Sequence, residues 1–404
     1  MTPTFRGAVA VALLVACVSG CGKKPPPPES ATPAPPILNA GPPPTDEEVN
    51  AFASRLENAV RDGDTAAVQD CVRIENLIDR CISDLNLGSN VQAGIRSGTS
   101  GVGRQLVEQI DATVKNGGSY TRLHTRTLGG KPAVLFRLLH PDGALNYHEI
   151  TVARHSDGKV AAEDLFVFVS GEPLSLTFRR LILQLLAGRD QKLGGKDREL
   201  FENMTQIQSF QNQAKAGDHA AALATFRRLP QRIQNEKPFQ LVAVMTASEV
   251  SEQDYLTEMT RFRTAHPNDP CLSIVSIDFH LLRKEYRQSL ANIDELDKAV
   301  GGDPYLDVMR ATVRLQEGNP KEALARAMAA IKAEPTLRQG HITAAQAAAA
   351  LKDHAAAAAH LRHAVEKADS TLDFAVLRAD AEWTVFRDSP EFVELEKWYA
   401  ARKK

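Results

Sequence analysis

Two residues in the middle of the chain have side chains suited to acid–base chemistry. They are His148 and Asp164, which lie in separate segments with the residue pattern of β-strands. An imidazole oriented by a carboxylate is a common general base. The pair can form only if the two residues lie at matching register positions on adjacent strands. The alternative, which the sequence favours, is a cross-strand ion pair or a solvated sheet face.

Arg137 is a third candidate for a polar pocket beside His148 and Asp164. Side chains alternate between the two faces of a strand, so Tyr147 and Glu149 share one face and His148 takes the other. These groups therefore cannot all line one pocket, and we do not expect the chain to be an enzyme.

The glycine-rich stretch Ser97 to Gly103 resembles a phosphate-binding loop only superficially. It lacks the Gly-Lys-Ser/Thr ending and follows no predicted strand. It also fails the Gly-x-Ser-x-Gly elbow, because Val102 stands where glycine is needed. We expect a flexible loop that caps the next helix.

The five cysteines lie at positions 17, 21, 71, 81 and 271. Cys71 and Cys81 are ten residues apart in a region with a helical pattern, and ten residues of continuous helix span about 15 Å. A disulfide would need the helix to break between Ala66 and Asp84. Two buried free thiols are the alternative. No Cys/His cluster has zinc-site spacing, so we expect no metal and no cofactor.

The elements that position these residues are helices followed by strands. Apolar residues recur at helical spacing from Val49 to Val60, a second helix carries Ala67 to Val72 and continues towards Arg80, and a third spans Leu106 to Val114. Four strand-like runs follow, separated by Gly-Gly and Asp-Gly turns. A helix from Leu174 to Leu186 closes the segment. Residues 46–190 are therefore predicted to form an α+β domain with a four-stranded antiparallel sheet.

This element order resembles the NTF2-like (cystatin-like) fold, in which a curved sheet wraps a long helix. The block from Arg137 to Glu149, with Asp164 and Gly171-Glu172, also resembles an N-terminal module that precedes tetratricopeptide repeats in bacterial lipoproteins. The resemblance implies no particular activity, since NTF2-like folds host both enzymes and non-catalytic pockets.

The N-terminus has the features of an export signal. Residues 1–20 contain Arg6 and a short apolar run, too short for an ordinary membrane span. The ending Val18-Ser19-Gly20-Cys21 resembles the bacterial lipobox, which implies that Cys21 carries a lipid and becomes the mature N-terminus; the alternative is an ordinary secretory signal. The proline-rich remainder of residues 21–45 favours an extended polyproline II tether.

Polar turns recur through the C-terminal half, and they end at His219, Tyr255, Tyr286, Pro320 and His354. The mean step is about 34 residues, which is the helix–turn–helix period typical of tetratricopeptide repeats. The last two steps are equal, whereas the first is longer and the second is shorter. Residues 196–370 are predicted to hold about five units of an all-α solenoid. Residues 371–404, which contain both tryptophans, are predicted to form a helical cap.

The functional prediction follows from this organisation. The net charge of −2 gives no electrostatic reason to expect nucleic-acid binding. We expect a non-catalytic scaffold in the bacterial envelope, anchored by its lipid and facing the periplasm or the exterior, that binds a protein or peptide. The alternatives are a small-ligand-binding or enzymatic cone and an outer-membrane assembly component. The candidate groove residues lie on the first helices of the units: Asp278, His280, Arg310, Arg314, Arg338 and His341.

Overall fold

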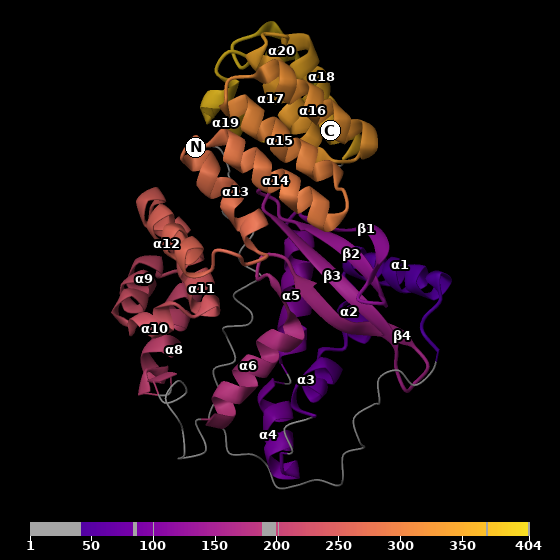
Figure 1. Cartoon of the computed structure of the whole chain (residues 1–404). Helices are drawn as coiled ribbons and strands as arrows, with labels where there is room; N and C mark the ends of the chain where they lie inside the picture. The colour runs from indigo at the N-terminus through magenta and orange to yellow at the C-terminus, as the bar shows by residue number, and fades with distance from the viewer. Residues whose placement is uncertain are drawn as a thin grey trace. The chain divides into compact units, whose positions relative to one another are not determined.

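A computed structural model describes residues 42–83, 87–99, 101–187, 199–200, 202–368 and 371–402. The predicted signal, Cys21 and nearly all of the proline-rich tether lie outside the described residues. The chain divides into two compact units, one ending at Leu272 and the other running from Ser273 to the C-terminus. Each unit is described by itself (Figure 1).

Among the described residues, five helices precede the sheet. They are α1 (Asp46–Asp62), α2 (Thr65–Val72), α3 (Ile74–Ile82), α4 (Ser89–Thr99) and α5 (Val102–Lys115). Thr45 and Glu48 form a reciprocal capping box at the start of α1, and Gly63, with φ of 70°, ends it in the left-handed conformation. The predicted stripe from Val49 to Val60 is buried, which confirms this helix.

Two local predictions in this region are wrong. The second predicted helix is broken by Arg73, whose φ of 47° separates α2 from α3. The stretch from Ser97, expected to be a flexible loop, instead holds the end of α4 and the start of α5. Ile95 and Thr99, four residues apart, are both buried, so the packing of one helix face outweighs the local glycines.

Cys71 and Cys81 are free and buried despite the break at Arg73. The Cys71 sulfur accepts a hydrogen bond from Arg55 Nε at 3.2 Å. The Cys81 thiol donates to the Ser175 carbonyl at 3.2 Å. The two sulfurs thus have different partners, and the structure corresponds to the free-thiol alternative.

The sheet is antiparallel and follows chain order. Its strands are β1 (Ser119–Leu128), β2 (Lys131–Leu139), β3 (Leu145–Arg154), β4 (Val160–Val167) and the two-residue β5 (Glu172–Pro173). The four long strands match the prediction, and β5 adds a fifth that is too short to leave an alternating pattern. Gly143 and Gly158, at φ of 91° and 79°, make turns between the strands.

One face of the sheet packs on helices (Figure 1). Strand residues such as Phe136, Ile150 and Leu165 share a buried cluster with Phe52 of α1 and Phe178 of α6 (Leu174–Ala187). This cluster is the core of the α+β domain. The candidate site described below also lies in this domain.

The first unit continues with α8 (Met204–Lys215), α9 (His219–Arg228), α10 (Gln231–Gln234), α11 (Lys237–Val250) and α12 (Glu252–Ala265). Phe210 and Phe226 join α8 to α9, with ring centroids 5.2 Å apart. Phe239 and Val242 of α11 extend the same buried cluster.

The second unit holds the regular part of the array: α13 (Leu272–Leu282), α14 (Tyr286–Val300), α15 (Pro304–Gln316), α16 (Pro320–Ala333), α17 (Arg338–Ala350) and α18 (His354–Lys367). Helices α14, α16 and α18 begin at equal steps along the chain. Their equivalent positions are all fully buried: Ser289, Ile293 and Leu296; Ala323, Ala327 and Ala330; Ala357, Leu361 and Ala364. These helical hairpins fit a tetratricopeptide-like solenoid.

The C-terminal segment contains α19 (Phe374–Ala379), the short 3₁₀ helix η2 (Ala381–Trp383) and α20 (Pro390–Arg402). Trp383, Phe386 and Phe392 pack with Ala345 and Leu361 of α17 and α18 in one buried cluster. Large aromatic side chains thus cover the small side chains of the last hairpin. Among the described residues, no helix combines the length and the apolar character needed to cross a membrane.

Candidate functional site

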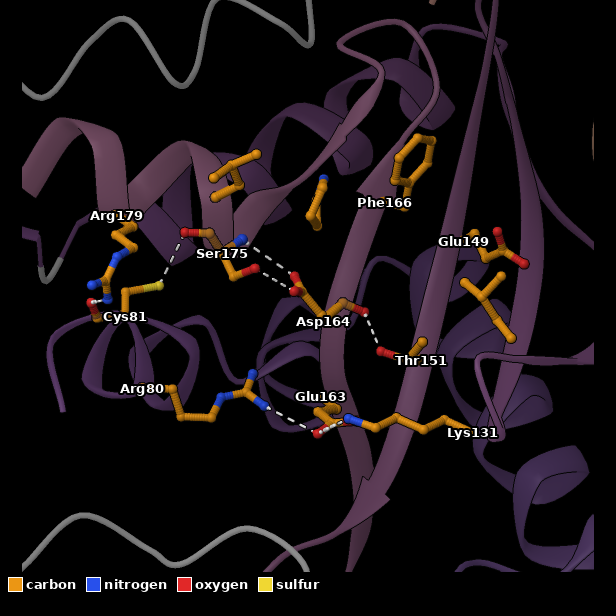
Figure 2. A pocket seen from close by; sticks show the side chains of 13 residues that line it. Arg80, Cys81, Lys131, Glu149, Thr151, Glu163, Asp164, Phe166, Ser175 and Arg179 are labelled. Carbon is orange, nitrogen blue, oxygen red and sulfur yellow. Dashed lines mark hydrogen bonds and ion pairs between the residues drawn. The ribbon is translucent and has the colours of Figure 1, made fainter. Parts of the chain in front are cut away.

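The α+β domain has a cavity of about 570 Å³ lined by strands β3 and β4 and by helices α3 and α6 (Figure 2). Strands β3 and β4 supply Glu149, Thr151 and Asp164. The end of α3 and the start of α6 form the facing wall. The lining residues of these two helices are Arg80, Cys81, Ser175, Leu176 and Arg179.

Asp164 joins the sheet to the facing helix. Its Oδ1 accepts hydrogen bonds from the backbone N–H groups of Leu165 at 2.8 Å and Ser175 at 3.2 Å. The Ser175 hydroxyl donates to Oδ2 of the same carboxylate (Figure 2). The carboxylate therefore satisfies an N–H group in the first turn of α6, where negative charge is also favoured by the helix dipole.

The other carboxylates of the cavity are paired with cations. Glu149 accepts two hydrogen bonds from the Arg126 guanidinium, one of them from Nη2 at 2.8 Å, and this pairing raises the pKa of Arg126. Lys131 Nζ lies 2.8 Å from Glu163 Oε1. Each carboxylate thus has a cation to balance it, which suits a stable polar wall.

Arg80 is paired less closely with a carboxylate than Arg126 and Lys131 are. Its Nη1 lies 3.9 Å from Glu163 Oε1, while its Nε is buried without a hydrogen-bond partner among the described residues. Burial lowers the pKa of Arg80. The guanidinium still carries its charge at neutral pH because its ordinary pKa is far higher. The cavity wall therefore keeps one cationic group with spare donor capacity.

The lining residues contain no nucleophile activated by a base. Burial raises the pKa of the Cys81 thiol to about 11, which keeps it protonated at neutral pH. The Ser175 hydroxyl is bound to a carboxylate, and none of the lining residues is a histidine. The arrangement is suited to binding a small polar molecule by hydrogen bonds and charge.

His148 and Asp164 do not meet. Strand register pairs His148 with Val167 and Asp164 with Thr151, so the condition for an acid–base pair fails. His148 instead lies fully buried and pairs in register with Phe136 of the core cluster, on the face that parity sets opposite to Tyr147 and Glu149. Arg137 pairs in register with Tyr147 and does not line the cavity. Of the three predicted pocket residues, only Asp164 contributes to it.

The surroundings of His148 fix a neutral ring. The Asn146 side-chain oxygen accepts from the backbone N–H groups of Tyr147 at 2.8 Å and Val169 at 3.1 Å, so its amide nitrogen faces the ring. That nitrogen lies 3.3 Å from His148 Nε2, which must accept, while Nδ1 lies 3.3 Å from the Tyr120 hydroxyl. Burial lowers the pKa of His148 to about 4.

The predicted groove residues lie on α13, α15 and α17. His280 is buried, with Nδ1 2.6 Å from Glu285. Arg310 lies 2.7 Å from Asp297 and 2.8 Å from Asp294. Arg314 pairs with Glu317 and Glu322. Much of the positive charge is thus balanced inside the array.

The remaining groove candidates are less exposed than the sequence suggested. Asp278 is half-buried, and burial raises its pKa well above the ordinary value. Arg338 keeps a buried Nε without a partner among the described residues. His341 is 1% exposed and lies beside His360 and His363. Sequence reasoning missed this histidine cluster, although the i, i+3 spacing of His360 and His363 was a signal for it.

No family model matches the sequence, and no curated protein matches it. Among solved structures, MamA 41-end from Desulfovibrio magneticus RS-1 is 16% identical, with a TM-score of 0.35, covering 42% of this chain and 97% of that chain. MamA MSR-1 C2 is 14% identical, with a TM-score of 0.33, covering 43% and 97%. These likenesses are weak, and the hairpin architecture is established by the packing of α14 to α18 itself.

Proposed function

We propose that the chain is a non-catalytic protein-interaction scaffold held at the bacterial envelope by a lipid on Cys21. The observation that carries the proposal is the repeated hairpin packing of the second unit, in which equivalent positions of α14, α16 and α18 are buried. Stacked hairpins bury one side of each helix and leave a continuous face for a partner. A protein or peptide is the class of partner that such a face fits.

The first helices of two successive hairpins supply the candidate binding face. Thr312 of α15 and Gln346 of α17 are half-buried polar residues related by one repeat step. Residues at equivalent repeat positions point in the same direction, and Gln346 there also donates a hydrogen bond to Glu382 of η2. A bound segment would contact Thr312 and reach Gln346 beside η2. This face adds to the charged groove candidates, whose roles in binding are also proposals.

Photo-crosslinking tests the binding face. A photoreactive amino acid is placed at Thr312 or Gln346 in the full chain, and at the exposed Ala325 or Ala359 as matched controls on α16 and α18. Irradiated envelopes are expected to give a discrete adduct from the first pair and none from the second. Adducts from the control pair alone would place the partner elsewhere. Mass spectrometry of the adduct would show whether the partner is an outer-membrane assembly component.

The lipid anchor rests on the lipobox resemblance of the leader. A lipid would fix the scaffold to a membrane, and the proline-rich tether would let the folded units reach a partner at raised local concentration. Cys21→Ala is expected to move the protein to the soluble fraction, whereas Cys17→Ala should leave it with the membrane. Membrane retention of the Cys21→Ala protein would refute the anchor.

The α+β domain supports a second candidate function, the binding of a small anionic ligand. We propose an NTF2-like arrangement for residues 46–170, with the cavity beside Arg80 as the ligand site. The incompletely paired Arg80 guanidinium favours this function. A thermal-shift screen of small carboxylates and phosphates should give a stabilising ligand whose effect is lost in Arg80→Gln. The absence of any such ligand, or an equal shift in Arg80→Gln, would oppose it.

A further inference from the structure

Three histidines meet between the last two helices of the repeat array. His341 lies on α17, and His360 and His363 lie on α18, where the spacing of three places both on one side of the helix. Each offers one ring nitrogen, and these three atoms lie within 4.8 Å of one another. The ring centroids are 5.8 Å to 6.4 Å apart. Three imidazoles therefore converge on one small volume.

The hydrogen bond of His341 determines which of its nitrogens is available. Its Nε2 lies 2.9 Å from the Pro335 carbonyl oxygen, which can only accept, so Nε2 carries the proton. Nδ1 then holds a free lone pair, and this atom is buried without a hydrogen-bond partner among the described residues. A backbone carbonyl that binds the second ring nitrogen is the usual support of a metal-binding histidine.

His360 resembles His341 in the surroundings of its Nδ1 atom. Its Nδ1 is buried and likewise has no hydrogen-bond partner in the described part of the chain. A neutral imidazole with a free lone pair is the form that coordinates a metal ion. A buried polar atom without a partner costs free energy, which a bound ion would recover.

We propose that His341, His360 and His363 bind one divalent transition-metal ion, with Zn²⁺ as the best-suited ion. Three imidazole ligands and a water molecule are a recognised zinc geometry. Zinc–nitrogen bonds of about 2.0 Å with tetrahedral angles place the nitrogens about 3.3 Å apart, so the ring nitrogens need to approach one another by about 1.5 Å at most. His360 and His363 are half-buried, which leaves a route for the ion and the water.

The charges around the cluster set its affinity. Lys367 lies near His341 and its charge opposes a cation, whereas the carboxylate of Asp353 acts on His360 in the opposite sense. The ion would join α17 to α18 in the hairpin on which the aromatic cap packs. Because the ligands come from two helices, the unfolded chain lacks the site, and binding should stabilise the folded state.

Isothermal titration with ZnCl₂ tests the proposal. The full chain is purified without a polyhistidine tag, stripped with a chelator and dialysed. We expect one Zn²⁺ per chain, a raised melting temperature with Zn²⁺ but not with Mg²⁺, and loss of binding as the pH falls below about 6.5. Co²⁺ in place of Zn²⁺ should give the strong visible absorption of tetrahedral coordination.

Single substitutions at the ligands complete the test. His360→Ala and His363→Ala are each expected to weaken binding by about tenfold to a hundredfold or more, with unchanged circular dichroism. His354→Ala is the control, because His354 lies on the same helix but stacks on Phe386 instead. The proposal is overturned if the wild-type chain shows no saturable binding tighter than about 1 mM, or if the double variant His360→Ala/His363→Ala binds zinc as the wild type does.

Discussion

Glu258 of α12 lies buried against Arg227 of α9, with its Oε1 2.9 Å from the guanidinium Nε. Only 2% of the Glu258 side chain is exposed, and Arg261 pairs with its other oxygen at 3.2 Å. In the other units, the equivalent positions hold alanine or serine. The departure of this repeat from the small-residue pattern is therefore accommodated by two arginines that neutralise one buried carboxylate.

Removing the two arginines should destabilise the protein more than removing the glutamate. The double variant Arg227→Ala/Arg261→Ala leaves a buried carboxylate unpaired, at a cost of about 3 kcal/mol. Glu258→Ala restores the small residue of the repeat pattern and leaves two partly exposed arginines, at about 1 kcal/mol or less. Urea denaturation followed by circular dichroism measures both, and the reverse order would contradict the assignment.

Asp164 should behave as a capping residue. Asp164→Ala removes the acceptor for the Ser175 N–H and hydroxyl groups, and a loss of about 1 to 2 kcal/mol is expected. Asp164→Asn keeps one side-chain oxygen and should lose less. Thermal unfolding compares the two variants, with Glu47→Ala, an exposed residue of α1, as control. Equal stability of Asp164→Ala and the wild type would disprove the capping role.

His148 should make the protein less stable in acid. Its folded-state pKa of about 4 lies below the ordinary value near 6.5, so the unfolded chain binds more protons between these values. Stability contributed by neutral His148 is present above pH 6.5 and falls as the pH drops towards 4, by roughly 3 kcal/mol in all.

The change in this slope between wild type and variant isolates the effect, because the half-buried His140 and the buried His155 also have pKa values lowered by burial. His148→Gln should flatten the loss between pH 6.5 and 4, whatever its effect on stability at pH 7. Denaturation midpoints at several pH values give this slope. An unchanged slope in the variant would show that His148 does not bind the proton.

A side chain larger than alanine should not fit at the contact between α15 and α16. Ala323 is fully buried where these helices meet, so Ala323→Leu is expected to cost about 1 to 3 kcal/mol by overpacking. Ala325→Leu, at an exposed position of the same helix, should change stability by less than about 0.5 kcal/mol. Melting temperatures distinguish the two, and similar values would argue against the close helix crossing.

Much of the architecture could be predicted because it depends on local periodicity in the sequence. The regularly spaced turns, the small residues that follow them and the alternation of the four long strands are short-range patterns that chain geometry converts directly into helices and strands. The break at Arg73 and the helix α4 were not predicted. Both features depend on which hydrophobic helix face packs against another element, and a local glycine or arginine does not predict that packing.

The candidate sites, in contrast, depended mostly on contacts between segments that are distant in the sequence. The sequence by itself determined that His148 and Glu149 point to opposite faces, because side-chain parity belongs to a single strand. Only the tertiary structure decided that Asp164 caps α6, because that depends on the register of β4 and the docking of a helix eleven residues later. It alone also brought His341 to His360 and His363, because the spacing of three residues places His360 and His363 on one side of α18, whereas their contact with His341 requires α17 to pack beside that side.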